Sequence, residues 1–371
     1  MNIHPFRAWY PKLEQIPSPD IFFGSLKKKY VAYREAGFFK QLPEAALFIY
    51  RILTKDSSYI GLLVCTPTSE YEAGNILKHE NTIAQKEEKT KELILHRQAI
   101  VKPVLLTYPK VEQINQLILN YSQHNPPLYS TFFESDQQTH QLWNITDNQL
   151  SQQLQVLFRK KVKTSYIADG HHRTTTMSLL NQQFAEQRSQ GDFSQLMVSL
   201  FGADQLKIHA FNRVVQVEPN YTPAAFLKKM ATLCTIEKLN VPRKPTKKHE
   251  LVLFAAHNWY ALTWKKNLLL NKAFSPSLLD VQLLNEHVLK GILGVEDIRR
   301  DSRIKYIEGT KGWQGLEAVT LQNSNNVGFH LYPIQIEELM AMANQHILLP
   351  PKSTYFEPRI KNGLLIKNLL D

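Results

Sequence analysis

The chain has 371 residues, of which 43% are hydrophobic and 21% charged, as is usual for a globular protein, and this length predicts about two domains. Its cysteines are Cys65 and Cys234, which excludes a disulfide framework or a thiolate zinc site and favours a reducing, cytoplasmic location. We expect neither a signal segment nor a membrane span, because no apolar run reaches the length of about 18 residues that a span requires.

The formal net charge of +11 raises the question of nucleic-acid binding. Most of the excess comes from scattered lysines. The one dense patch, Lys238 to Lys248, is proline-rich and has no aromatic residues on which bases could stack. We interpret this patch as a solvated loop rather than a nucleic-acid groove. The positive charge is equally compatible with a small anionic substrate.

The predicted elements of the first half alternate between strands and helices, which is the pattern of an α/β arrangement. A short extended segment at residues 3–8, stiffened by a proline, opens the chain. The elements that follow, in chain order, are a hairpin of strands at 46–53 and 59–66, a charged helix at 84–100, a buried strand at 101–108, a helix capped by Thr146 or Asp147 that buries Leu150, Leu154 and Leu157, a strand ending at Ala168, and a helix with Met177, Leu180 and Phe184 at core spacing.

The composition changes between Pro219 and Pro245, a segment rich in lysine and proline that is the best candidate for a lobe boundary or insertion. We therefore predict a mixed α/β (α+β) fold with a core lobe at residues 1–218 and a second α+β lobe at residues 219–371. The second lobe is expected to contain a strand pair at 251–264, a helix at 278–290, a strand at 328–332 and a final helix with Ile336, Leu339, Met340, Ala343 and Ile347 on one face.

The most informative stretch is residues 166–173, which read Tyr-Ile-Ala-Asp-Gly-His-His-Arg. An apolar strand here ends in a polar turn, and a helix follows at once. The start of a helix offers free backbone N–H groups, and nearby cations add fixed charge, so this arrangement favours phosphate binding. The alternative is a polar surface turn, because short motifs often match by chance. The residues that we expect around a phosphate are Asp169, Gly170, His171, His172, Arg173 and Thr174.

A second polar cluster, residues 78–82, reads Lys-His-Glu-Asn-Thr and precedes a helix with several lysines in its first two turns. Lysines at that end oppose the helix dipole, at a cost of about 0.3–1 kcal/mol each, unless an anion binds there. The alternative is an exposed helix laced by Lys–Glu pairs. Lys86, Lys89 and Arg97 fall near one face, and we expect Lys86 to contribute to an anion site. Asn81 and Thr82 are candidates for substrate contacts.

Phosphoryl transfer to a hydroxyl group requires a carboxylate or an imidazole within hydrogen-bond distance of that hydroxyl. Glu80 is the best candidate for this general base, and His79 is the second. Asp169 offers the same chemistry, or it holds a magnesium ion beside the phosphates. The sequence does not divide these roles among the three residues.

A third polar segment, residues 350–359, begins with two prolines. Its Lys352, Ser353 and Thr354 would present a cation and two hydroxyl groups to an anion. Taken alone, the segment is more typical of a structured surface loop. A weaker cluster, interpreted as a solvated helix end, consists of Arg299, Arg300, Asp301 and Arg303.

Several familiar phosphate and hydrolase motifs are missing from the sequence. It contains no P-loop, no glycine fingerprint for dinucleotides and no nucleophile elbow. The adjacent His171 and His172 also lack the spacing of zinc ligands. Any phosphate must therefore be bound by another route.

Nearly the whole chain resembles the domain-of-unknown-function family 1015. The turn at residues 169–173 is also similar to the phosphate-handling turn of the ParB/sulfiredoxin-like superfamily, whose members hold nucleotide phosphates at a Gly-x-x-Arg junction between strand and helix. The landmarks that carry the resemblance are residues 3–8 (Ile-His-Pro-Phe-Arg-Ala), 78–82 with Lys86-Glu87, 167–173, Asn285-Glu286-His287, Leu293-Gly294 and 350–358.

The resemblance implies a ParB/sulfiredoxin-like core, with a mixed sheet flanked by helices, and a phosphotransferase related to free L-serine kinases. It implies pyrophosphate or a nucleotide (ATP or ADP) as donor, magnesium as cofactor, and free L-serine or a similar small molecule as acceptor, giving O-phosphoserine. Residues 169–173 and Lys86 would hold the donor, Glu80 or Asp169 would take the acceptor proton, and residues 350–358 would return to the same cleft. Two departures from the family pattern are Ser18-Pro19-Asp20, in place of a Tyr-Asp segment, and Lys89-Thr90, in place of an acidic–basic pair.

The alternative function is a ParB-like nucleotide-binding switch or nucleic-acid adaptor that uses the same turn without turnover. The lack of a recognisable helix-turn-helix segment counts against it. Both hypotheses depend on one structural prediction. Residues 78–86 and 169–173, far apart in sequence, must meet to form a single cationic cradle.

Overall fold

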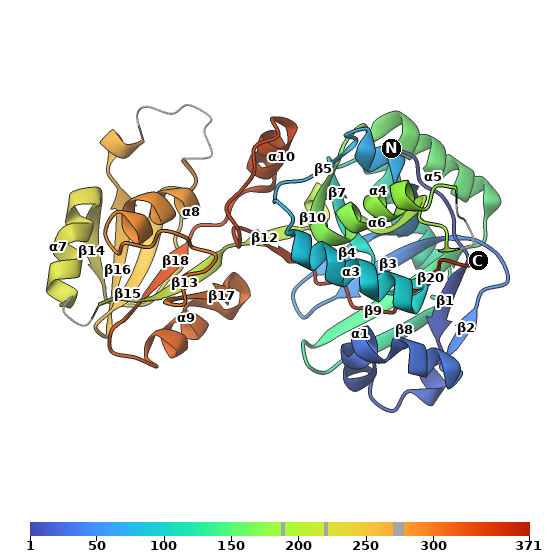
Figure 1. Cartoon of the computed structure of the whole chain (residues 1–371), viewed down its shortest axis with the longest axis horizontal. Helices are drawn as coiled ribbons and strands as arrows, with labels where there is room; N and C mark the ends of the chain where they lie inside the picture. Colours follow the sequence, from blue (N-terminus) through green and yellow to red (C-terminus); the bar gives the residue numbers. More distant parts are fainter. Residues whose placement is uncertain (187–189, 219–221, 270–277) are drawn as a thin grey trace. The chain divides into compact units, whose positions relative to one another are not determined.

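The computed structural model describes residues 1–186, 190–218, 222–269 and 278–371. The chain forms two compact units (Figure 1). The first comprises Met1–Lys207 and Pro358–Asp371, and the second comprises Ile208–Glu357. Each unit combines sheets with helices, so the predicted mixed α+β fold class is confirmed.

An eight-stranded mixed sheet forms the centre of the first unit. In spatial order its strands are β5 (Ile76–Leu77), β10 (Ser165–Asp169), β7 (Val104–Tyr108), β11 (Gln195–Gly202), β4 (Ser58–Pro67), β3 (Leu47–Leu53), β9 (Gln138–Ile145) and β8 (Tyr129–Phe133). Two neighbouring pairs, β5 with β10 and β7 with β11, are parallel, and β3 with β4 forms the predicted hairpin. The central strands are almost continuously buried, as expected of a sheet that is covered on both faces.

The helices predicted in the first unit are present. Asp147 caps α5 by accepting hydrogen bonds from the backbone N–H groups of Gln149 and Leu150, at 2.8 and 3.1 Å. Helix α3 packs against α6, and α6 in turn contacts β7 (Figure 1). The bounds are α1 (Pro19–Glu35), α2 (Ser69–Glu72), α3 (Ala84–Arg97), α4 (Glu112–His124), α5 (Asn148–Lys161) and α6 (His171–Gln183).

The C-terminal segment belongs to the first unit, whereas the sequence analysis assigned it to the second lobe. Its strand β20 (Ile366–Asn368) pairs on one side with β1 (Ala8–Pro11) and on the other with β6 (Ala99–Ile100). A fourth strand, β2 (Phe39–Gln41), completes this smaller sheet. Pairing between strands so far apart in sequence leaves no mark in local composition, which is why the sequence did not indicate it.

A six-stranded antiparallel sheet forms the second unit, with the order β14-β16-β15-β18-β13-β17. The strand pair predicted at residues 251–264 is the hairpin β15–β16. The strands are β13 (Phe211–Gln216), β14 (Cys234–Leu239), β15 (Glu250–Ala255), β16 (Asn258–Trp264), β17 (Ile304–Glu308) and β18 (Asn326–Leu331), beside a two-stranded ribbon of β12 (Lys207–His209) and β19 (Tyr355–Glu357). The helices are α7 (Pro223–Leu233), α8 (Asp280–Leu283), a π-helical segment (Leu284–Lys290), α9 (Gly312–Thr320) and α10 (Ile336–Asn344).

The lysine-rich segment between Pro219 and Pro245, expected to mark the lobe boundary, lies inside the second unit instead. Residues 219–221 fall outside the described part of the chain, but the rest contains α7 and β14. Because β14 is an edge strand, an exposed lysine such as Lys238 protects it from pairing with other strands. The unusual composition therefore reflects an exposed edge rather than a linker.

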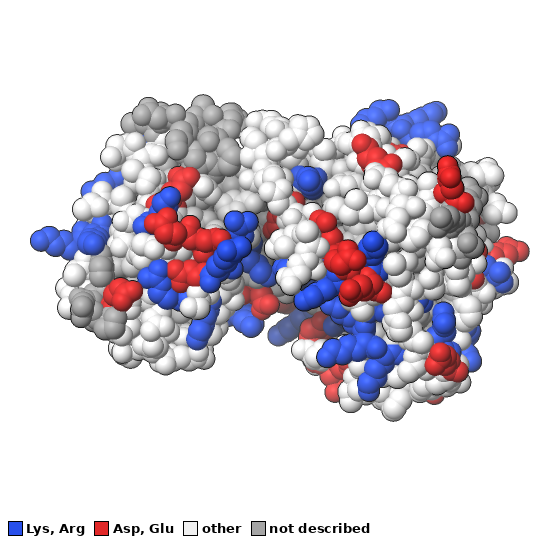
Figure 2. Space-filling view, viewed as in Figure 1, with Lys and Arg blue, Asp and Glu red and all other residues white. Residues whose placement is uncertain are grey.

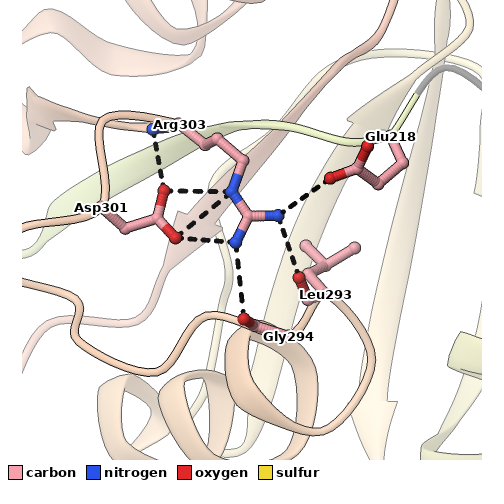
Figure 3. Close-up of polar contacts among 5 residues, drawn as sticks. All are labelled: Glu218, Leu293, Gly294, Asp301 and Arg303. Carbon is pink, nitrogen blue, oxygen red and sulfur yellow. Dashed lines mark hydrogen bonds and ion pairs between the residues drawn. The ribbon is translucent and has the colours of Figure 1, made fainter.

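Arg303 fixes a loop of the second unit (Figure 3). Its guanidinium lies 2.7 Å from the carboxylate of Asp301 and donates to the backbone carbonyls of Leu293 and Gly294, at 3.1 and 3.5 Å. A longer contact of 3.5 Å joins it to Glu218. The expected solvated helix end is therefore a structural bridge at Arg303, because backbone carbonyls that sequence cannot reveal converge on it.

The buried carboxyl of Asp280 provides a test of the second unit's stability. Burial raises the pKa of Asp280 to about 7, although the carboxylate accepts N–H groups of His249 and Trp264, both at 3.0 Å. Because the folded pKa lies above the unfolded one, the stabilisation is present at low pH and is lost as the pH rises through about 7, with a slope of at most about 1.4 kcal/mol per pH unit. The free energy of unfolding of Asp280→Asn should lack this dependence on pH. Urea unfolding between about pH 4 and pH 8 should show the unmodified protein losing stability relative to the variant as the pH rises. A constant difference in the free energy of unfolding would contradict the prediction.

Basic and acidic side chains are interspersed on the face drawn in Figure 2. On that face they do not separate into the continuous basic track with which proteins follow a nucleic-acid backbone. Within the described ranges, no helix is both long enough and apolar enough to cross a bilayer.

Candidate functional site

The turn at residues 169–173 joins the buried strand β10 to helix α6. Gly170 has a φ of +112°, in the region that favours glycine. A Cβ atom at this position would lie 2.7 Å from Nη2 of Arg173. The guanidinium therefore lies close over the turn, and a side chain at position 170 would make it shift. The positive φ is the stronger reason for glycine here, because an L residue would be strained in that conformation.

The carboxylate of Asp169 binds two cations. Its Oδ2 atom lies 2.9 Å from Nζ of Lys102 and 3.2 Å from Nη2 of Arg173. Burial raises the pKa of Asp169, but the charges of Arg173 and Lys102 outweigh it and bring the pKa below its usual range. Arg173 also donates to the carbonyl of Pro103 at 3.3 Å. Asp169 is thus a positioning residue that fixes both cations beside the start of α6.

Asp169 stays a candidate for holding magnesium beside donor phosphates, because Mg²⁺ is usually bound through one or two carboxylates together with substrate phosphates and water. Among the described residues, no group of three His, Cys, Asp or Glu side chains could hold a metal by itself. The Oδ2 atom of Asp169 is paired with Lys102 and Arg173, so a metal would have to bind the other carboxylate oxygen. The proposed chemistry rests on these two cations.

His79 and His171 bring the two predicted clusters into contact. Their rings meet edge to face, with centroids 4.5 Å apart and planes at 88°. The side chains are only 1% and 6% exposed. Burial lowers the pKa of His79 well below its usual range and lowers the pKa of His171 to about 4. Both rings are neutral at physiological pH, so the positive charge of the turn comes from Arg173 and Lys102 and not from these histidines.

His172 connects the two helices. Its Nε2 atom accepts a hydrogen bond of 3.1 Å from the backbone N–H of Ile83, the N-cap residue of α3. Burial lowers the pKa of His172, and Lys86 lowers it further, which keeps Nε2 available as an acceptor. A second link, 3.3 Å long, runs from the hydroxyl of Thr176 to the carbonyl of Glu87. The predicted meeting of residues 78–86 with residues 169–173 is therefore confirmed.

This bond gives a local prediction. His172→Phe keeps an aromatic ring but removes the acceptor, so the amide of Ile83 should exchange with solvent about five-fold faster, the factor that corresponds to about 1 kcal/mol for one hydrogen bond. His172→Gln offers a side-chain oxygen and should restore part of the protection. Hydrogen–deuterium exchange at residues 83–87 measures the effect, and equal protection in all three proteins would contradict it.

The segment that leads into α3 carries the other candidates. Glu80 and Thr82 are half-buried, and Asn81 is exposed. Lys86 is exposed and lies close enough to His172 to lower its pKa. His79, being 1% exposed, is closed to a substrate hydroxyl, which leaves Glu80 as the first candidate for the base.

Two other predicted contacts have structural roles. Thr174 is 0% exposed, and its hydroxyl donates to the carbonyl of Gly170 at 3.3 Å, which holds the turn closed. In the second unit, Ser353 is 3% exposed and donates to the carbonyl of Pro350 at 2.6 Å. Lys352 lies over the ring of Phe211, with Nζ 4.8 Å from the centroid. The loop interpretation of residues 350–359 thus accounts for the contacts of Lys352 and Ser353, and Thr354 also makes contacts of its own.

Lys102 is the residue that the sequence analysis missed. It belongs to the stretch 101–108, which was read only as a buried apolar strand. In the structure Lys102 precedes β7, and its ammonium group pairs with Asp169. A lysine in a buried run is itself a signal, because a buried ammonium group requires a partner.

Comparisons with known proteins place this geometry in context. A family model described as "Protein of unknown function (DUF1015)" matches residues 10–285. No curated protein matches the chain. Similar solved structures include SbnI with a C-terminal truncation from Staphylococcus aureus, at 13% identity and a TM-score of 0.42, covering 81% of this chain and 87% of the other. They also include a free serine kinase in complex with AMP, at 13% identity and a TM-score of 0.37 (81% and 92% covered), and a conserved hypothetical protein from Pyrococcus furiosus, at 12% identity and a TM-score of 0.37 (81% and 95% covered).

Proposed function

The chain belongs to the DUF1015 family, and from that premise we propose that it is a phosphotransferase, which transfers a phosphoryl group from pyrophosphate or a nucleotide to the hydroxyl of free L-serine or a similar small acceptor. One observation carries the proposal: the start of α6, Arg173 and Lys102 converge at a turn that also contacts the segment bearing Glu80. The acceptor class comes from the resemblance of these motifs to free serine kinases.

The donor phosphates would bind at the start of α6. The first hydrogen bond of this helix runs from the N–H of Thr174 to the carbonyl of Gly170, at 3.0 Å. The N–H groups before Thr174 have no acceptor within the helix and are the donors with which helix termini bind phosphate. Arg173 adds a planar guanidinium and Lys102 an ammonium group, and both suit phosphate oxygens.

Asp169 positions Lys102 and Arg173 without cancelling the whole of their positive charge. It shares one carboxylate oxygen between Lys102 and Arg173, so one negative charge faces two positive ones. Lys86 lies near His172 and adds a further positive charge. The resulting excess of positive charge is fixed in place before an anion arrives, which is what electrostatic catalysis of phosphoryl transfer requires.

In the proposed reaction, the carboxylate of Glu80 takes the proton of the acceptor hydroxyl. The acceptor oxygen then forms a bond to the transferred phosphorus, while the bond from that phosphorus to its bridging oxygen breaks. The bridging oxygen leaves with inorganic phosphate, or with the remainder of the nucleotide. The cations of the turn neutralise the charge that develops on this leaving group.

A direct assay tests the proposal. Purified protein is incubated with pyrophosphate, ATP or ADP and with a panel of hydroxyl-containing amino acids, in buffers with and without magnesium. Mass spectrometry should detect a phosphorylated amino acid with at least one donor, with phosphoserine as the expected product. Failure to form product with every donor and acceptor would overturn the proposal. A donor that binds without turnover would instead support a nucleotide-binding switch.

A further inference from the structure

The first unit contains a cavity of about 270 Å³ between α3, α6 and the sheet. Its walls come from α3, from β6 and β7, from β11 and from the first turns of α6. The apolar lining residues include Leu93, Ile94, Val104, Met177 and Leu196. This volume is near the lower end of the range of about 300–1,000 Å³ for small-molecule pockets.

All the charged residues that line this cavity are positive. They are Lys27, Arg97, Lys102 and Arg173, and no carboxylate is among the lining residues. Asp169 neutralises part of the charge of Lys102 and Arg173. Lys27 is exposed, so among the lining cations the one that is buried without a carboxylate partner in the described part of the chain is Arg97, and such a charge loses hydration at a cost.

Arg97 is the buried cation of this cavity that lacks an ion pair with any described residue. It is only 8% exposed, and burial lowers its pKa. Within the described ranges it forms no ion pair, and its Nη2 atom donates a hydrogen bond to the backbone carbonyl of Lys27. None of its nitrogens is both fully buried and unpartnered, in contrast to Nε of Arg173, so the other N–H groups of Arg97 remain accessible to a bound molecule.

The lining excludes several ligands. A free amino acid would leave its ammonium group among four cations without a carboxylate to bind it. Pyrophosphate has no apolar part that could cover the walls formed by Leu93, Ile94 and Met177, so the cavity beyond the cations of the donor site would stay unfilled. The ligand that fits both features has one anionic head, which matches the fork of a guanidinium, and an apolar body.

We propose that this cavity is a binding site for a small organic monocarboxylate, whose carboxylate pairs with Arg97 and whose apolar body lies between α3 and the sheet. The cavity shares Lys102 and Arg173 with the proposed donor site, but the proposal needs no turnover and its test changes neither of these residues, so its failure and that of the phosphotransfer reaction are distinguishable. Lys27, which is exposed on α1, would attract the ligand at the rim.

Calorimetric titration of the full chain with benzoate, hexanoate and the neutral isostere benzamide tests this site. The carboxylates should bind, and benzamide should bind at least about ten-fold more weakly, because charge-assisted hydrogen bonds to Arg97 are lost. Lys27→Glu should weaken benzoate binding about ten-fold. The matched control Lys28→Glu, which makes the same charge change at an exposed neighbour that does not line the cavity, should change it less than about two-fold.

Arg97→Gln should abolish benzoate binding, and a thermal melt shows whether this buried substitution leaves the protein folded. If it does not, the Lys27 and Lys28 variants, both at exposed positions, still decide the question. Three results would overturn the proposal: no binding of either carboxylate, equal binding of benzoate and benzamide, or equal effects of Lys27→Glu and Lys28→Glu.

Discussion

Arg173→Ala is expected to weaken pyrophosphate binding by about 100-fold or more, the factor that corresponds to the loss of about 3 kcal/mol of charge-assisted hydrogen bonds. The guanidinium lies over Gly170 at the start of α6, where the donor would bind, and its removal takes away one of the two cations that Asp169 positions. The fold should survive, because Asp169 keeps its ion pair with Lys102. Isothermal titration with pyrophosphate measures the loss, and a circular dichroism melt measures stability.

Two further variants separate the charge of Arg173 from its shape and provide a control. Arg173→Lys keeps the charge but loses the planar fork, so it should recover only part of the affinity. Arg159→Ala removes an exposed arginine of α5 that contacts Asn2, away from the turn, and should bind pyrophosphate as the unmodified protein does. If Arg173→Ala unfolds the protein, or if it binds pyrophosphate normally, the turn is structural and the proposed donor site is wrong.

Glu80→Gln is expected to reduce kcat by about 100-fold or more, which is the usual contribution of a general base, while donor affinity stays within about two-fold. The amide keeps the size of the carboxylate but cannot take the acceptor proton. Steady-state kinetics with the best donor and acceptor, together with donor titration, separate the two effects.

The control for Glu80 is Glu88→Gln, the same chemical change at an exposed position on α3. It should leave kcat unchanged. A comparable loss of kcat in both variants would mean that kcat depends on the negative charge of this region as a whole and not on Glu80 as the base. A loss of donor binding in Glu80→Gln would move Glu80 from proton transfer to donor recognition.

The first departure from the family pattern has a structural explanation. Ser18 caps α1 by accepting a hydrogen bond from the N–H of Ile21, at 3.4 Å. The carboxylate of Asp20 accepts the backbone N–H groups of Glu134 and Ser135, at 2.8 and 3.4 Å, and also the hydroxyl of Ser135. The segment therefore ties α1 to the turn after β8. Its contacts are with the fold and not with the turn at Asp169.

The second departure, Lys89-Thr90, also becomes clear from the contacts of α3. The hydroxyl of Thr90 donates to the carbonyl of Lys86 one turn earlier, at 2.7 Å, and Lys89 is exposed. Arg97, predicted near the same face as Lys86 and Lys89, lies at the other end of the helix and is buried. Thr90 and Arg97 both line the cavity below α3. One helix thus bears an exposed lysine beside His172 at its start and a buried arginine at its end.

The sequence by itself determined the local elements and the chemistry of the turn. Helix-prone composition located α3, core spacing located α5 and α6 (with a cap at α5), and the apolar run ending at Ala168 located β10, because these signals depend on neighbouring residues alone. The pairing of Gly170 with Arg173 came from the resemblance to the phosphate-handling turn of the ParB/sulfiredoxin-like superfamily. The meeting of residues 78–86 with residues 169–173 was also anticipated, from two motifs with one chemical character rather than from any local signal, but the ring contact of His79 with His171 was not.

Tertiary structure alone decided which of these groups carry charge and which are accessible. The neutrality of His79 and His171, the pairing of Lys102 with Asp169 and the cavity beside Arg97 all follow from burial, which depends on residues distant in sequence. The return of β20 to the first unit has the same origin, since its strand partners lie hundreds of positions away in the chain. Desolvation and long-range strand pairing are properties of the folded chain, and a linear pattern of residue types does not encode them locally.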